Sequence, residues 1–145
     1  MKLKRKMSKY FSYQELTKSG TADRLKIDNT PTPEIAMHLG ELAMFLDDLR
    51  EAWGSGIKVT SGFRCDKLNE FVGGSKTSAH PMGYAADIYP SNGKFEEFKT
   101  FVVNYVKDKD YDQCILEKNG SDVWVHVGLR NRKGQQRKQC FKIEQ

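Results

Sequence analysis

An imidazole and a carboxylate lie seven residues apart, across an interruption of regular secondary structure, in the stretch Ser78-Ala79-His80-Pro81-Met82-Gly83-Tyr84-Ala85-Ala86-Asp87. His80 precedes a proline and lies near Gly83, so we expect it on an irregular loop. Residues 85–89 read as a short strand that begins directly after this loop. A loop ligand that faces a strand ligand can hold one metal ion, although a hydrogen-bonded structural pair fits His80 and Asp87 equally well.

Working outward, two strands are predicted downstream at residues 113–118 and 123–129, joined around Asn119-Gly120, a strong hairpin signal. With an even number of loop residues, Glu117 projects from the same face as Trp124 and His126. With a four-residue loop, Glu117 pairs with Trp124 and lies diagonal to His126. Residues 139–143 could add an edge strand.

Upstream, the pattern predicts a capped helix from Ser12 that ends at Gly20, followed by a polar connection over residues 21–33. The long helix is the clearest element. It begins with Thr32 as N-cap and ends before Gly54, and its apolar stripe consists of Ile35, Leu39, Leu42, Leu46, Leu49 and Trp53.

A strand at residues 57–61 leads into Arg64, and a guanidinium just past a strand end can bind a carboxylate or stabilise an oxyanion. A surface ion pair is the commoner fate of an arginine. Residues 66–72 are predicted as a short helix, and a second amphipathic helix starts after residues 91–93. His38 lies off the stripe of the long helix, where we expect a surface or boundary position.

Composition limits the class of protein. The 145 residues, 38% of them hydrophobic, fit one globular domain, and no apolar run approaches the roughly 20 residues of a membrane span. We expect a basic leader over residues 1–9 and one α+β domain over residues 10–145, with a small, mainly antiparallel sheet packed against helices. The leader has no apolar region typical of a secretory signal.

The net charge of +5 comes largely from the two ends of the chain. This pattern favours an anionic partner, such as nucleic acid or a polyanionic cell envelope. Solvated tails that keep the protein soluble explain it at least as well. Nucleic-acid binding is the weaker reading, because neither end interleaves aromatic with basic residues. Cys65, Cys114 and Cys140 form no close-spaced pair and are expected to be reduced thiols.

Two histidines and an aspartate, His80, Asp87 and His126, form a ligand set that suits one zinc ion and leaves a position for water. A carboxylate beside the metal can take a proton from that water. Glu117 is our candidate for this base, because it faces the same side of the hairpin as His126.

Four motifs of this chain resemble the M15 family of zinc peptidases, and more narrowly its phage and prophage peptidoglycan-hydrolase branch. They are Ser61-Gly62-Phe63-Arg64, Val72-Gly73-Gly74-Ser75, Ser78-x-His80-x-x-Gly83-x-Ala85-x-Asp87 and Trp124-Val125-His126-Val127. The similarity runs from about Phe11 to Leu129 in family order and implies an M15 or hedgehog-like zinc peptidase fold.

The resemblance implies that His80, Asp87 and His126 bind zinc, that Arg64 contacts substrate or the developing oxyanion, and that Ser78 lines the substrate side. Trp124 is a further candidate for substrate binding. The resemblance also implies hydrolysis of peptidoglycan stem peptides, as a D,D-carboxypeptidase or an L,D-type endopeptidase. Such a protein would be made in the cytoplasm and act at the cell wall after release, or be carried in a phage particle with phage structural proteins as partners.

The chain departs from the family at the general base. Several relatives hold an acidic residue three positions before the last histidine or a second histidine two before it, where this chain has Val123 and Trp124. Glu117 remains the first candidate for the base, and Asp122 is the second. A degenerate peptidase that keeps zinc for structure and serves in wall binding or particle assembly is the alternative. A cysteine hydrolase based on Cys65 is a further one.

Overall fold

A five-stranded sheet forms the centre of the computed structural model, which describes residues 6–145. The strands lie in the order β1-β2-β4-β3-β5 and pair antiparallel, except that β5 runs parallel to β3. Their bounds are β1 Ile57–Ser61, β2 Ala85–Pro90, β3 Gln113–Asn119, β4 Asp122–Gly128 and β5 Gln139–Glu144. The predicted α+β class, with a mainly antiparallel sheet packed against helices, is confirmed.

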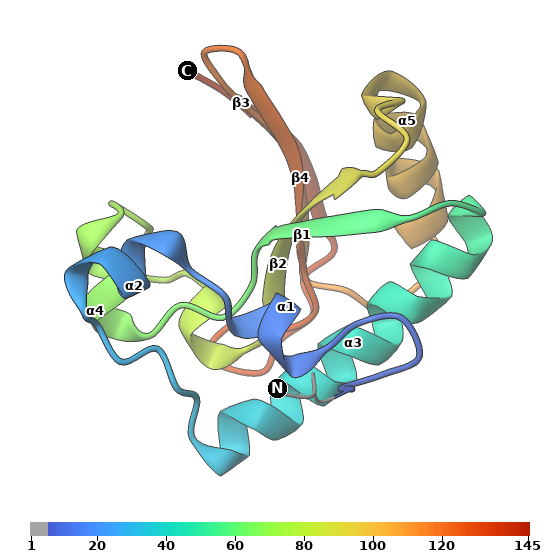
Figure 1. Cartoon of the computed structure of the whole chain (residues 1–145). Coiled ribbons are helices and arrows are strands. Elements are labelled where there is room, and N and C mark those ends of the chain that lie inside the picture. Colours follow the sequence, from blue (N-terminus) through green and yellow to red (C-terminus); the bar gives the residue numbers. More distant parts are fainter. Residues whose placement is uncertain (1–5) are drawn as a thin grey trace.

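The long helix α3 (Pro33–Trp53) has the boundaries that its sequence predicts. The Thr32 hydroxyl accepts a hydrogen bond from the backbone N–H of Ile35, and Gly54 ends the helix in a left-handed conformation with φ 81°. The four leucines of its stripe are buried with α5 (Phe95–Val106) in the hydrophobic core, and Ile35 and Trp53 at the two ends of the stripe are partly buried against it. Figure 1 shows α3 and α5 together on one side of the sheet, with α2 (Gly20–Leu25) and α4 (Asp66–Phe71) on the other side.

The prediction for residues 12–33 is partly wrong. The capping box at Ser12 is present, but α1 (Tyr13–Thr17) ends before Gly20, which is instead the first residue of α2. The side chain of Ser19 caps α2 by accepting from the N–H of Ala22, and Ala22 is buried. Local capping and the burial of one small residue therefore form a helix within a segment whose polarity predicts a loop.

The hairpin of β3 and β4 has the predicted register. Glu117 pairs with Trp124, and Ile115 pairs with His126, so Glu117 lies diagonal to His126. The ladder continues one pair further than expected, to Asn119 and Asp122, which shortens the loop to two residues. Glu117, Trp124 and His126 consequently share one face of the sheet.

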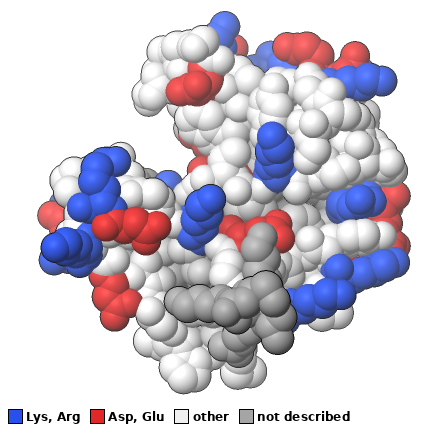
Figure 2. Space-filling view, in the orientation of Figure 1, with Lys and Arg blue, Asp and Glu red and all other residues white. Residues whose placement is uncertain are grey.

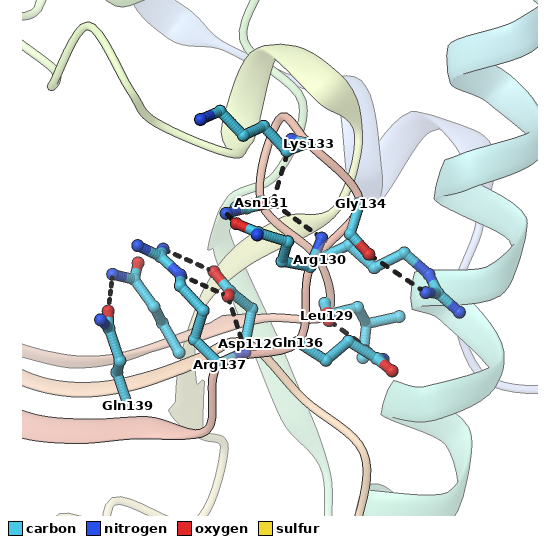
Figure 3. Close-up of polar contacts among 11 residues, drawn as sticks. Asp112, Leu129, Arg130, Asn131, Lys133, Gly134, Gln136, Arg137 and Gln139 are labelled. Atoms are coloured by element: carbon cyan, nitrogen blue, oxygen red, sulfur yellow. Dashed lines mark hydrogen bonds and ion pairs between the residues drawn. The ribbon is translucent and has the colours of Figure 1, made fainter.

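The basic segment of residues 129–138 is a folded strap between β4 and β5, and its three arginines all make ion pairs. Arg130 contacts Glu41, Arg132 contacts Asp66 and the Ser78 carbonyl, and Arg137 contacts Asp112. Asp112 is buried, and the Arg137 side chain donates to both of its carboxylate oxygens, at 2.8 and 2.9 Å (Figure 3). This part of the basic C-terminal region is thus not a solvated tail.

Replacing Arg137 with alanine is expected to lower the free energy of unfolding by about 2 kcal/mol, because it removes the ion pair and leaves the buried Asp112 carboxylate with the backbone N–H of residue 137 as its remaining donor from the strap. Arg130→Ala is a matched control from the same strap. It breaks an exposed pair with Glu41 and should cost less than about 1 kcal/mol. Urea unfolding measures both, and equal costs would contradict the distinction.

The Arg137 effect should depend on pH. Burial acts to raise the pKa of Asp112, but the hydrogen bonds from Arg137 outweigh it and lower this pKa. A carboxyl group whose pKa is lower in the folded than in the unfolded protein stabilises the fold at pH values above the unfolded pKa of about 3.9. This contribution is lost progressively as the pH falls from there through the folded-state pKa. The stability difference between wild type and Arg137→Ala should therefore shrink below about pH 4.

The end of the predicted leader contacts α3. Lys9 forms an ion pair with Glu51, and the backbone N–H groups of Lys9 and Tyr10 donate to the carboxylate of Asp47. Residues 1–5 of the leader lie outside the described part, and the boundary between leader and domain stays a prediction. In the described part of the chain, none of the helices has the length and apolar character that a membrane span requires.

Candidate metal centre

His80 begins a short 3-10 turn, η1 (His80–Met82), rather than a fully irregular loop. Its ring is 2% exposed, and its Nδ1 donates to the carbonyl of Gly62 at 2.7 Å. The backbone N–H of His80 donates to the hydroxyl of Ser78. Both contacts fix the imidazole so that its second nitrogen, Nε2, faces Asp87.

Asp87 and His126 are direct neighbours on β2 and β4. The Nδ1 atom of His126 lies 3.0 Å from Oδ1 of Asp87, and Nε2 of His80 lies 3.4 Å from the same oxygen. All three side chains are buried. The expected meeting of a loop ligand with strand ligands is therefore present, and the hairpin contributes the third residue.

The hydrogen-bond chemistry of His80 favours a cation between these groups. The Gly62 carbonyl can only accept, so Nδ1 of His80 carries a proton, and in the neutral ring Nε2 presents a lone pair. Burial lowers the pKa of His80, which favours that neutral ring. A lone pair then faces a carboxylate oxygen, and this repulsion is relieved when a metal ion binds both atoms.

The charge state of Asp87 suits the same role. Burial acts to raise the pKa of this carboxyl, but the facing His80 and His126, when their rings carry a proton on the side of Asp87, outweigh it and hold the pKa below its usual range. The three ligand atoms all lie within 4.8 Å of one another. Ligands about 2.0 to 2.2 Å from a tetrahedral zinc ion stand roughly 3.4 Å apart, so the cluster could hold such an ion with little movement.

Glu117 lies close to this cluster and is half-buried. Its Oε2 atom accepts a hydrogen bond of 2.9 Å from the indole N–H of Trp124. Burial, together with the negative charge of Asp87, raises the pKa of Glu117. A diagonal neighbour across two strands is about 7 to 8 Å away between Cα atoms, which brings the Glu117 carboxylate within reach of a ligand held by His126.

The second candidate base, Asp122, lies at the hairpin end. It is exposed and pairs with Asn119, four residues before His126. A strand rises about 3.4 Å per residue, so Asp122 is roughly 13 Å from His126 along β4. Of the two carboxylates, Glu117 is the one that the fold brings to the cluster.

Arg64 enters the site from the segment that follows β1. Its Nη1 atom donates to the Ser61 hydroxyl at 3.4 Å, and its backbone N–H donates to the His80 carbonyl. Burial lowers the pKa of Arg64, whereas Asp87 and Glu117 act to raise it. Its buried Nε has no hydrogen-bond partner among the described residues, so the guanidinium retains a donor.

The cluster opens into a cleft of about 650 Å³. One wall comes from the Val72-Gly73-Gly74-Ser75 segment and the loop up to Ser78, and the opposite wall comes from β3 and β5. Figure 2 shows the corresponding notch in the surface, between the hairpin end of the sheet and the α2 and α4 side. Arg64, Ser78, Glu117 and Trp124 line the cleft together with the three candidate ligands.

Two groups that hold this site in place could not be predicted from the sequence. The first is the Gly62 carbonyl that orients His80, because a backbone acceptor leaves no trace in residue type. The second is Asn69, a buried side chain that donates to the Ser75 carbonyl. A Cβ on Gly74 would meet Asn69 Oδ1, which explains the second glycine of that motif. The only hint of this support in the sequence is a polar residue, Asn69, within a short helix.

Two histidines and one carboxylate at the floor of an open cleft, with a further carboxylate alongside, are typical of mononuclear metal hydrolases. Comparison with known families identifies the particular group within this class. The family model described as Peptidase M15 matches residues 9–132, and the chain belongs to this family of metallopeptidases. A search of curated proteins found no match.

Proposed function

We propose that this protein is a zinc-dependent peptidase that hydrolyses peptide bonds in peptidoglycan stem peptides, as a D,D-carboxypeptidase or an L,D-type endopeptidase. The observation that carries the proposal is the arrangement of His80, Asp87 and His126, in which bare imidazole nitrogen and carboxylate oxygen converge beside Glu117 in an open cleft. Membership of the M15 family supports the peptidase activity.

We assign the zinc-holding role to His80 Nε2, His126 Nδ1 and the carboxylate of Asp87. A bound zinc ion would lower the pKa of water and polarise a substrate carbonyl. Trp124 engages Oε2 of Glu117, so we assign Oε1 as the atom that accepts a proton from the attacking water. Because burial raises the pKa of Glu117, its carboxylate is a stronger base than an exposed one.

The remaining groups bind substrate in this proposal. Arg64 supplies guanidinium donors to a substrate carboxylate or to the developing oxyanion, which its place in the lining of the cleft supports. Ser78 and Trp124 both line the cleft. We further propose that the protein acts at the cell wall after release from the cytoplasm or as part of a phage particle, where phage structural proteins would be partners.

Mass spectrometry of fragments released from defined peptidoglycan tests the proposal. The protein should release stem-peptide fragments whose masses identify one cleaved bond. A chelator should stop their release, and added zinc should restore it. Fragment release that is unaffected by the chelator would contradict the metal mechanism, and release by Cys65→Ser at the wild-type rate would dispose of a cysteine hydrolase.

A further inference from the structure

The β5 strand adds an apolar wall to the cleft and lies beyond the residues that match the family, which end at 132. Phe141 and Ile143 both line the cleft. Phe141 is paired with Ile115 and Ile143 with Glu117, so both side chains share the sheet face of the candidate base. Phe141 nevertheless remains 42% exposed.

Large apolar residues in β5 alternate with other residues, so the apolar side chains all project from one face of the strand. Its two largest apolar residues face the cleft, whereas Cys140, Lys142 and Glu144 project from the opposite face. Phe141 and Ile143 thus present apolar surface to the cleft, and an apolar part of a bound substrate would cover it.

The position of this wall sets which part of a substrate it can touch. His126, Ile115 and Phe141 lie in one row across three neighbouring strands, so Phe141 is about two strand spacings, or roughly 10 Å, from the ligand histidine. An extended peptide advances about 3.3 to 3.6 Å per residue. Two residues span about 7 Å, and the side chains of Phe141 and of the substrate bridge the rest, so Phe141 can meet the side chain of the second residue from the bond being cut.

The wall is apolar only over a short length. On one side, the side chains of Gln113 and Gln139 bond to each other at 3.0 Å, and on the other side lie Lys118 and Asn119, which also line the cleft. Between these polar ends, the strip of Ile115, Phe141 and Ile143 fits the methylene stem of one side chain whose polar head can reach water or the flanking polar groups.

We propose that Phe141 and Ile143 form a specificity subsite for the aliphatic stem of the third residue of a stem peptide. This inference rests on the proposed function. Whether the bond between the first and second residues or the bond between the fourth and fifth is cut, the third residue is the second residue from it. It lies on the C-terminal side of the cleaved bond in the first case and on the N-terminal side in the second, so the two activities require the peptide to run in opposite directions past the β5 wall.

Two stem-type pentapeptides test the subsite, one with lysine and one with alanine as the third residue. NMR titration gives their dissociation constants for the zinc-loaded protein, with Glu117→Gln as the background so that cleavage of either peptide is slowed about a hundredfold or more. The lysine peptide should bind about tenfold more tightly than the alanine peptide, since several methylenes leave water. Adding Phe141→Ala should reduce this preference to less than about twofold.

Lys142→Ala is the matched control, because Lys142 neighbours both subsite residues but faces away from the cleft. It should retain the tenfold preference, and a thermal melt should show that each variant is folded. Equal binding of the two peptides, or a preference that survives Phe141→Ala, would overturn the subsite alone. Failure of the zinc-loaded protein to bind either peptide would overturn the subsite and the stem-peptide proposal together.

Discussion

His126→Ala is expected to abolish peptidase activity and to weaken zinc binding by more than a hundredfold. Loss of an outer partner of a metal ligand already costs about 10- to 100-fold in metal affinity, and His126 is itself one of the three candidate ligands. Equilibrium dialysis against zinc at buffered concentrations measures the affinity, and fragment release from peptidoglycan measures the activity.

Two further variants separate ligand loss from damage to the fold. Asp87→Asn nearly preserves the shape of the side chain but removes the charge that faces both imidazoles, and it should also bind zinc more weakly than wild type. His38→Gln removes the remaining histidine, which contacts the Met82 carbonyl, and should change zinc affinity less than tenfold. Normal zinc affinity in folded His126→Ala would show that the metal site lies elsewhere.

Glu117→Gln is expected to lower kcat by roughly 10²- to 10⁴-fold, the usual contribution of a general base, while zinc content stays at the wild-type level. The amide keeps the size of the side chain and can still accept from Trp124, but it cannot take a proton from water. Turnover of a defined stem pentapeptide and metal analysis of the same samples test both halves of this expectation.

Asp122→Asn is the matched control for Glu117→Gln. It makes the same chemical change on the same hairpin, at an exposed residue roughly 13 Å from His126 along the strand, and should leave kcat within about twofold of wild type. A large loss in Asp122→Asn with none in Glu117→Gln would reverse the assignment of the base. Zinc binding without turnover in the wild-type protein would instead favour the degenerate wall-binding or assembly module.

The candidate site is largely predictable from sequence because its residues sit in strongly patterned segments. His80 and Asp87 are separated by a proline, a glycine and the start of a strand, so their meeting follows from a local change of backbone direction. The parity of a hairpin then fixes that Glu117 shares a face with His126, and the observed register agrees. Alternation along strands carries this information without any knowledge of the tertiary fold.

Other features depend on contacts between distant segments and could not be predicted. Arg137 and Asp112 lie 25 residues apart, and only the parallel docking of β5 brings them together. The α2 helix forms in a polar segment because Ser19 caps it and Ala22 finds a place in the interior. The role of the β5 wall requires knowing that β5 pairs with β3 rather than with β1.

Stepwise addition of zinc to chelator-treated protein, with turnover of a stem pentapeptide followed at each step, tests the central claim most directly. Turnover should rise in proportion to added zinc and level off at one ion per chain, and His126→Ala should show no rise over the same range. Turnover by the metal-free protein, or an equal response in His126→Ala, would contradict a zinc peptidase built on His80, Asp87 and His126.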